Sequence, residues 1–195
     1  MMTVAIPAWN AQCLIPPVNE LNPSAAERSP YSVSLVDFVL RFGTSKERII
    51  ILDGLLRYRA ALHDAGLTRG FQWLDGSFLE NVEVLKSRAP KDIDLVTFYR
   101  LPDNKSQRDL LSQFPQLFDA SAHQKLKNDY QVDSYLVHLG MTAERLITQA
   151  TYWYSMWSHR RNQSWKGYVQ VDLAHAEDAD AKEALNNLRN QGIQP

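Results

Sequence analysis

Two aspartates separated by one residue are the first side chains in this sequence whose types and spacing could do chemistry. Asp92 and Asp94 open a run of apolar residues that predicts a strand over 93–99. Alternate residues of a strand point to the same face, so the two carboxylates should project together while Ile93 enters the core. Adjacent carboxylates repel one another, and a divalent cation such as magnesium, which prefers oxygen ligands, removes that repulsion. The same pair is also typical of a solvated loop, so other motifs have to decide between the two interpretations.

A glycine and a serine end the strand predicted just upstream, over 71–75. Gly76 permits a ligand to approach the backbone closely. If segment 78–85 begins as a helical turn, its free N–H groups and the Ser77 hydroxyl would face an anion, for which a triphosphate is the natural candidate. The alternative is an ordinary turn in which Ser77 caps the segment that follows.

A third acid, Asp133, lies in segment 131–137, which has the composition of a strand. Beside a neighbouring strand that carries the first two aspartates, Asp133 could be a third metal ligand or the general base that takes a proton from an acceptor hydroxyl. The alternative is an edge-strand acid paired with Lys127 or Arg145.

Basic residues lie between the glycine turn and the first aspartates. Lys86, Arg88 and Lys91 could grip the phosphates of a nucleotide or of an RNA acceptor, and Lys91 directly precedes the acids. The alternative is a solvated basic loop with no ligand.

Aromatic and basic residues mix again later in the chain. Trp153 and Trp157 precede His159, Arg160 and Arg161. Such a mixture could stack the bases of single-stranded nucleic acid. The helical spacing of the two tryptophans favours core packing instead, with the arginines at the end of a helix where cations suit its dipole.

Helices and four strands are predicted to position these residues. Ser34 and the capping-box spacing of Thr44 and Glu47 mark two helix starts, and Pro115 divides a later helical segment. The helical segments are 35–41, 45–64, 106–128 in one or two pieces, 142–159 and 178–190, and the strands are 71–75, 93–99, 131–137 and 168–173. The clean alternation of the last strand indicates an outer strand. The order predicts a mixed α+β fold, a small mixed sheet of about four strands with helices packed on it.

Composition excludes several classes of protein. The 195 residues carry 21 lysines and arginines against 22 acids, which argues against binding to nucleic acid or membrane through bulk charge. Cys13 is the only cysteine, so no internal disulfide can form and a cytoplasmic location is expected. No apolar run has the length of a membrane span, and no histidine spacing indicates a zinc site. Walker, dinucleotide-binding and Gly-x-Ser-x-Gly motifs are absent from the sequence.

The Gly-Ser turn, the Asp-x-Asp pair and the strand that carries Asp133, taken together, are similar to the motifs of a known superfamily. Their order resembles the nucleotidyltransferase superfamily of DNA polymerase beta, particularly its minimal bacterial members. The chain is more similar still to an uncharacterised bacterial family with this fold, from about Ile6 to Leu173. The residues that carry this resemblance are Ile6-Pro7 through Pro16-Pro17, Arg48 in its helix, Gly76-Ser77-Phe78, Pro90-Lys91-Asp92-Ile93-Asp94, Asp133, and the lysines Lys127 and Lys166.

The resemblance implies roles for the motif residues. Gly76 and Ser77 would hold nucleotide phosphates, and Asp92 and Asp94 would bind magnesium or manganese, with Asp133 completing the acidic triad. The activity implied is transfer of a nucleotidyl group from a nucleoside triphosphate to a hydroxyl of a protein, an RNA such as tRNA, or a small molecule. Bacterial relatives often belong to toxin–antitoxin or phage-defence systems.

Two further expectations complete the sequence-based picture. The alternative function is a catalytically idle antitoxin or regulatory partner on the same fold, whose aromatic C-terminal half makes the interface. The chain divides into an extended, proline-rich N-terminal arm over 1–31, a nucleotidyltransferase-like domain over 32–175 and a C-terminal helix over 176–195.

Overall fold

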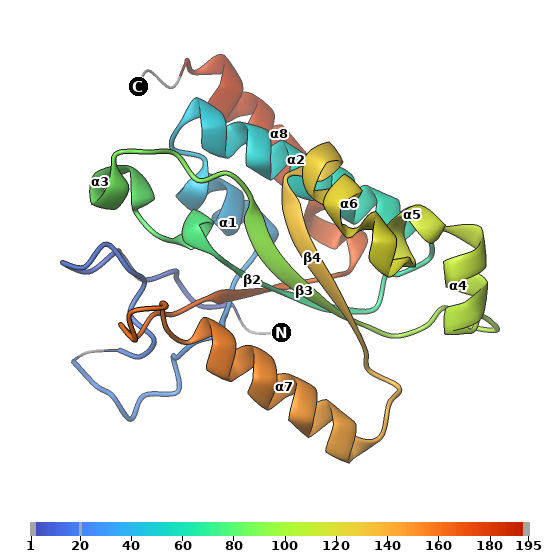
Figure 1. Ribbon diagram of the computed structural model, residues 1–195. Helices are drawn as coiled ribbons and strands as arrows, with labels where there is room; N and C mark the ends of the chain where they lie inside the picture. The colour runs from blue at the N-terminus through green and yellow to red at the C-terminus, as the bar shows by residue number, and fades with distance from the viewer. Residues whose placement is uncertain (1–2, 20, 193–195) are drawn as a thin grey trace.

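A mixed five-stranded sheet forms the centre of the protein, whose computed structural model describes residues 3–19 and 21–192. The strands are β1 (Tyr31–Ser32), β2 (Gly70–Asp75), β3 (Ile93–Tyr99), β4 (Val132–His138) and β5 (Val169–Asp172). They lie in the order β1-β5-β2-β3-β4 (Figure 1). The α+β class expected from the sequence is confirmed, with one strand more than the four predicted.

The strand directions bring the ends of three strands together. β2 pairs antiparallel with β3, and β3 pairs parallel with β4, so the C-terminal end of β2 meets the N-terminal ends of the other two. A parallel pair needs a crossover, and the helices α4 (Gln107–Gln113), α5 (Pro115–Phe118) and α6 (His123–Tyr130) supply it. The expected helical break at Pro115 is confirmed.

The expectation of an outer strand over 168–173 is wrong. β5 lies between β2, with which it pairs antiparallel, and β1, with which it pairs parallel. The two-residue β1 falls at the boundary of the segment predicted to be an arm, and so short a strand has no periodicity to detect. Flanking bonds extend the pairing, because the Val33 N–H donates to the Gln170 carbonyl.

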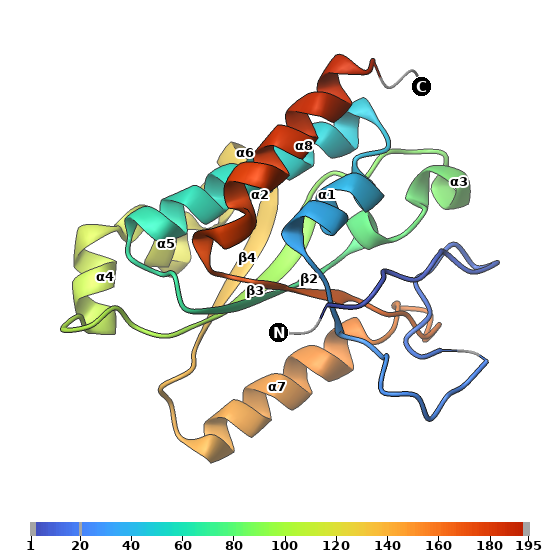
Figure 2. The same cartoon turned by 180° about the vertical axis from the view of Figure 1, so that it is seen from behind.

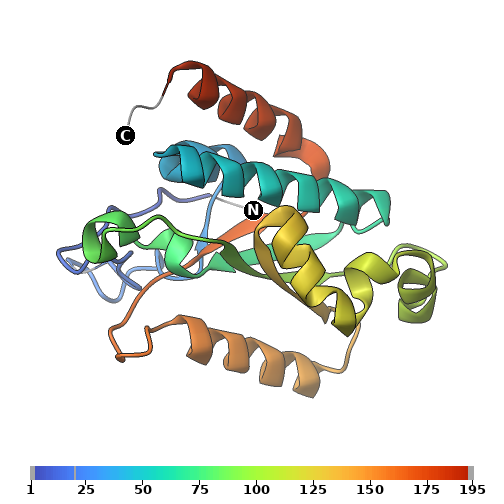
Figure 3. The same ribbon diagram turned by 45° about the horizontal axis from the view of Figure 1, so that its top comes forward.

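Helices cover the two faces of the sheet unequally. The helices α1 (Leu35–Phe42), α2 (Lys46–Asp64) and α8 (Asp178–Asn190) form a layer on one face, and α7 (Ala143–Trp157) lies alone on the other (Figure 3). The short α3 (Val82–Lys86) lies beyond the end of β2. Buried side chains between these layers form one continuous core. No helix among the described residues is long and apolar enough to cross a membrane.

Local sequence explains where the first two helices begin and how closely they pack. The Ser34 hydroxyl accepts from the Asp37 N–H and caps α1, as predicted. α2 is capped by Ser45 rather than by Thr44, since Ser45 accepts from the Arg48 N–H. Later in α2, a Cβ on Gly54 would meet the Tyr130 carbonyl oxygen at 1.9 Å, so glycine there lets α2 approach α6.

The N-terminal segment wraps over the loops that follow β2 and α7 (Figure 2). The Cys13 carbonyl accepts from the Asn81 N–H and the Ile15 carbonyl from the Gly167 N–H, and Leu14 and Ile15 are buried. Residues 1, 2 and 20 of the predicted arm lie outside the described residues, as do residues 193–195 of the predicted C-terminal segment. The segment thus tethers two loops that are distant in the sequence.

Candidate active site

Three aspartates form a row across the end of the sheet. Asp94 stands opposite Asp75 in the pairing of β2 with β3, and opposite Asp133 in the pairing of β3 with β4. Residues directly opposite in adjacent strands place their side chains on the same face, so the three carboxylates share one face. Asp92 precedes Asp94 by two residues and belongs to the same group. The structure therefore brings together the three acids singled out in the sequence and adds Asp75.

Gly76 lies against this row. It has φ +86°, and a Cβ there would stand 2.1 Å from Asp94 Oδ2. A side chain would therefore collide with the carboxylate as well as strain the backbone. The helical turn expected over 78–85 is broken into a single 3₁₀ turn, Ser77–Leu79, and the separate α3. What remains for binding an anion is the Ser77 hydroxyl beside the acid row rather than the N-terminus of a longer helix.

Lys127 compensates two of the acids. Its Nζ lies 2.7 Å from Asp92 Oδ2 and 2.9 Å from Asp133 Oδ2. His123 Nε2 lies 2.9 Å from the other oxygen of Asp133. Hydrogen bonds to both carboxylates raise the pKa of Lys127, so the lysine is a cation at neutral pH. The pairing of Asp133 with Lys127, weighed above as an alternative, is what the structure shows.

Asp94 is the uncompensated member of the group. No described residue forms an ion pair with its carboxylate. Burial, together with the charges of the three neighbouring aspartates, raises the pKa of Asp94 to about 7, although the charge of Lys166 opposes the shift. Strongly raised carboxylate pKa values in a cleft are typical of functional sites. At neutral pH the carboxyl is poised to ionise when a cation approaches.

Asp75 is a site residue that the sequence did not single out, and Lys166, which was named only as part of the family resemblance, was given no role there. Lys166 Nζ lies 2.9 Å from Asp75 Oδ2, and both side chains are almost fully buried. Burial raises the pKa of Asp75 although Lys166 opposes the shift. No hydrogen bond of acceptable geometry reaches Asp75 Oδ1. The available signal was the position of Asp75 directly before Gly76, but only the strand register places its side chain beside Asp94.

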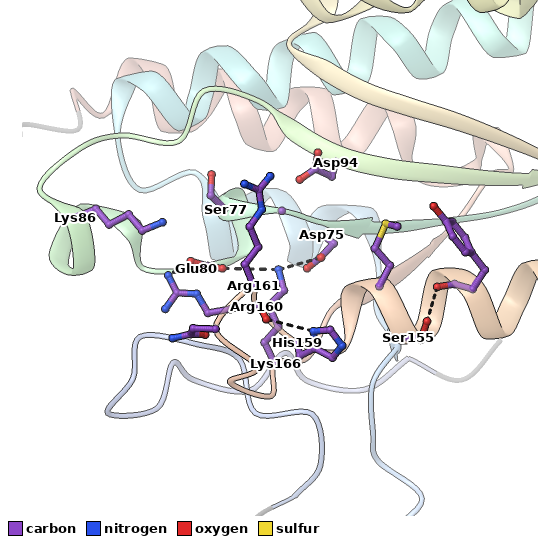
Figure 4. A pocket seen from close by; sticks show the side chains of 14 residues that line it. Asp75, Ser77, Glu80, Lys86, Asp94, Ser155, His159, Arg160, Arg161 and Lys166 are labelled. Carbon is purple, nitrogen blue, oxygen red and sulfur yellow. Dashed lines mark hydrogen bonds and ion pairs between the residues drawn. The ribbon is translucent and has the colours of Figure 1, made fainter.

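A pocket of about 940 Å³ opens in front of the row (Figure 4). One wall holds Asp75, Gly76, Ser77 and Asp94, and the opposite wall is the C-terminal half of α7 with the loop after it. The lining thus includes Gly76, Ser77 and Asp94 from the predicted site, together with Asp75, and it also includes residues of the two basic segments noted in the sequence, which are Lys86, His159, Arg160 and Arg161.

The remaining residues of the predicted site lie outside this lining. Asp92 and Asp133 stand behind it with Lys127, and Lys91 is exposed and does not line the pocket. Among the loop cations, Lys86 faces the pocket in place of Lys91 (Figure 4).

The carboxylate oxygens of the site are of the type that magnesium prefers, but they do not form a complete coordination site. Carboxylate oxygens are the ligands that magnesium prefers, and Asp94 together with the unpartnered Asp75 Oδ1 offers them to the pocket. Within residues 3–19 and 21–192, no group of three or more His, Cys, Asp or Glu residues is placed to hold a metal ion. The ammonium of Lys127 contacts both Asp92 and Asp133, so a cation bound by these two acids would have to displace it.

Comparison with known protein families gives a match over most of the chain. A family model described as a family of unknown function, DUF6932, matches residues 7–172. No curated protein and no solved structure shows a significant match to the chain. The matched region contains β1 to β5 and all the acids described above.

Proposed function

The chain belongs to DUF6932, a family of unknown function, and we propose from its site that it is a metal-dependent nucleotidyltransferase. The observation that carries this proposal is the row of Asp75, Asp94 and Asp133 beside Gly76, with Asp94 uncompensated at the wall of a pocket. Such an arrangement has no evident structural benefit, because the carboxylates repel one another. It becomes favourable when a divalent cation joins them.

The residues divide the work of nucleotidyl transfer between them. Asp94 with Asp92 would hold magnesium or manganese, which when bound supplies charge stabilisation at the reacting phosphate. The Ser77 hydroxyl would bind phosphate oxygens of a nucleoside triphosphate. Asp133, oriented by His123 and Lys127, would accept the proton of the acceptor hydroxyl. The acceptor oxygen then bonds to the α-phosphorus and pyrophosphate leaves.

Metal-dependent binding of nucleotides tests the proposal directly. ATP, GTP, CTP and UTP would be titrated by calorimetry with and without magnesium against the wild-type chain, Asp94→Asn and Asp103→Asn. Asp103 is a matched control, because it is an exposed acid that pairs with Arg69 far from the pocket. We expect metal-dependent binding in the wild type and the control, and its loss in Asp94→Asn. Binding that ignores magnesium, or that survives the Asp94 substitution, would contradict the proposal.

The acceptor is tested separately. Protein, RNA, including tRNA, and small-molecule hydroxyls are the three acceptor classes proposed. Incubating the wild-type chain with triphosphates labelled at the α-phosphate and a bacterial lysate should label one of these classes, and Asp94→Asn should abolish the label. Protein or tRNA labelling would fit a toxin–antitoxin or phage-defence role, and a single cysteine is consistent with the cytoplasmic setting proposed for it.

One observation favours a second candidate, a catalytically idle partner on the same fold. The ammonium of Lys127 already contacts both Asp92 and Asp133 and offsets one of their two negative charges, so a protein without bound metal would be partly compensated there. Replacing Lys127 by alanine distinguishes the candidates. An enzyme that must displace the lysine should bind manganese more tightly in Lys127→Ala, whereas an idle partner should show no metal binding in either form.

A further inference from the structure

The two ends of the pocket differ in chemistry. One end carries the Ser77 hydroxyl and the Lys86 ammonium, and the other is formed by α7, where Tyr152 and Met156 line the wall. In Figure 4, Asp94 and Asp75 lie between the Ser77–Lys86 end and the α7 residue Ser155. The order along the pocket is therefore polar and cationic, then acidic, then aromatic.

The cations of the first end are free to bind a ligand. Lys86 and Arg161 form no ion pair with any acid in the described part of the chain, and Arg161 reaches toward Ser77 and Asp94 in Figure 4. Arg160 and Lys166 on the same wall are different, because Glu80 and Asp75 compensate them. A polyanion in the pocket would thus find its unpaired counter-charges at Lys86 and Arg161.

The α7 end offers a flat apolar surface. Tyr152 and Met156 are four positions apart, so their side chains adjoin on the helix, and they are 50% and 46% exposed. The Tyr152 ring is supported edge-on by Trp153, with ring centroids 5.1 Å apart. An aromatic ring and a thioether together form a surface against which a planar ring can stack.

Besides the Tyr152 hydroxyl, α7 and the turn after it supply Ser155 and His159 to the lining, and His159 Nδ1 lies 3.2 Å from the Arg160 carbonyl oxygen. The Ser155 hydroxyl lies beside Tyr152, but it donates its hydrogen to the Tyr152 carbonyl oxygen at 3.0 Å. A site that contacts only the faces of a ring discriminates weakly between rings, whereas a site with fixed donors and acceptors discriminates strongly. The α7 end belongs to the first kind.

We propose that the pocket holds a nucleoside triphosphate in one orientation, with its phosphates at Ser77, Lys86 and Arg161 and its base stacked on Tyr152 and Met156. Because the base is held by its face, the site accepts purine and pyrimidine nucleotides with similar affinity. This inference rests on the proposed function, since it takes a triphosphate as the ligand, and it adds the orientation and the weak base selectivity.

Two tyrosine variants test whether the base of the nucleotide stacks on Tyr152 at the α7 end of the pocket. Dissociation constants of ATP, GTP, CTP and UTP with magnesium, and of inorganic tripolyphosphate, would be measured for the wild type, Tyr152→Ala and Tyr154→Ala. Tyr154 is the matched control, because it lies on the same helix with 42% exposure but does not line the pocket. Circular dichroism checks that each variant is folded.

The expected results are specific to this orientation. The four wild-type affinities should fall within about tenfold of one another. Tyr152→Ala should weaken all four by about fivefold or more, which is the range for loss of one stacking partner, and leave tripolyphosphate binding unchanged. Tyr152→Phe should keep the wild-type affinities, and Tyr154→Ala should match the wild type.

Failure of the inference can be told apart from failure of the proposed function. If triphosphates bind with magnesium but Tyr152→Ala is unaffected, or one base is preferred by more than about a hundredfold, the base-stacking orientation is overturned while the proposed function stands. If no triphosphate binds to the wild type with magnesium, both are overturned.

Discussion

Two groups of partly buried aspartates in this protein have opposite surroundings. Between α2 and α8, the Asp53 carboxylate contacts Lys182 at 2.6 Å and Arg189 at 2.9 Å. Although burial alone would raise it, hydrogen bonds from these cations lower the pKa of Asp53 to about 2. At the end of the sheet the acids gather against one another, and the pKa of Asp94 rises to about 7. The same residue type is thus stabilised as an anion in one place and destabilised in the other.

The paired acids between α2 and α8 stabilise the fold, whereas the acid row is suited to binding a cationic ligand. The α2–α8 contact is locally neutral and needs nothing more. The acid row is only partly compensated, because Lys127 contacts Asp92 and Asp133 while no described residue forms an ion pair with Asp94. Uncompensated acid in a cleft lowers the stability of the free protein and is expected where function requires it. Substitutions in the two regions should therefore act in opposite directions.

The largest effect is expected from Arg59 in the α2–α8 region. Its guanidinium is fully buried and donates to both oxygens of Asp178, to Gln72 and to the carbonyl of Asp172. Replacing Arg59 by methionine leaves buried acceptors without a donor and should lower the free energy of unfolding by about 3–5 kcal/mol. Urea denaturation measures this loss.

A surface arginine provides the control for that experiment. Arg69 pairs with Asp103 where both side chains are largely exposed, so Arg69→Met should lower stability by less than about 1 kcal/mol. If Arg59→Met lowered the free energy of unfolding as little as Arg69→Met, the ion pair of Arg59 with Asp178 would not stabilise the fold. The proposed contrast between the α2–α8 region and the acid row would then be wrong.

Replacing Asp94 is expected to raise the free energy of unfolding, whereas replacing Arg59 lowers it. The pKa of Asp94 is raised in the folded protein, so between about pH 4 and pH 7 the folded state binds more protons than the unfolded state and stability falls as pH rises. Asp94→Asn removes the ionisable group. With a chelator present, the variant should be more stable than the wild type by about 4 kcal/mol at pH 8 and nearly equal to it near pH 4. Thermal unfolding at the two pH values measures the difference, and a variant destabilised at pH 8 would contradict the proposed strain.

Much of the fold could be predicted because its signals are local. The apolar run of β3 and the helical spacing of α8 gave the observed bounds, Ile93–Tyr99 and Asp178–Asn190, since each element's pattern is contained in its own residues. The position of β5 could not be predicted in the same way. Its alternation is that of any half-buried strand, and β1, which covers its edge, is two residues long.

The same distinction applies to the candidate site, where features contained in one segment could be predicted and features that depend on strand pairing could not. The spacing of Asp92 and Asp94 indicated that the two acids lie close together, but only Asp94 lines the pocket, while Asp92 precedes β3 and pairs with Lys127. The contact of Asp133 with Lys127 was foreseen only as one of two readings, and the place of Asp75 in the row was missed. Both depend on the register between strands, which the sequence of one strand does not contain. The catalytic and metal-binding roles of these residues stay predictions.

Gly76 offers a smaller change that disturbs the acid row directly. Gly76→Ala places a Cβ at a positive φ and within 2.1 Å of Asp94 Oδ2, so it should lower stability by about 1.5 kcal/mol and shift the carboxylate. Gly192→Ala is the matched control, because Gly192 also has a positive φ but no atom lies within 4 Å of its Cβ position. Denaturation compares the two variants. Equal losses would mean that backbone strain alone, rather than the Asp94 contact, requires glycine at position 76.

The smallest change in stability is expected for Asp53, and its dependence on pH should be opposite to that of Asp94. Because its folded pKa is lowered, Asp53 contributes stability that is present above about pH 4 and is lost as pH falls toward 2. After allowance for solvent screening, Asp53→Asn should lower stability by about 1 kcal/mol at pH 7 and by little at pH 2. High salt should shrink the difference, since the partners are partly exposed. Opposite pH slopes for Asp53→Asn and Asp94→Asn, measured in one buffer series, would follow directly from opposite charge environments. Slopes of the same sign would mean that the acid row is compensated in solution by a cation that the neighbouring side chains do not supply.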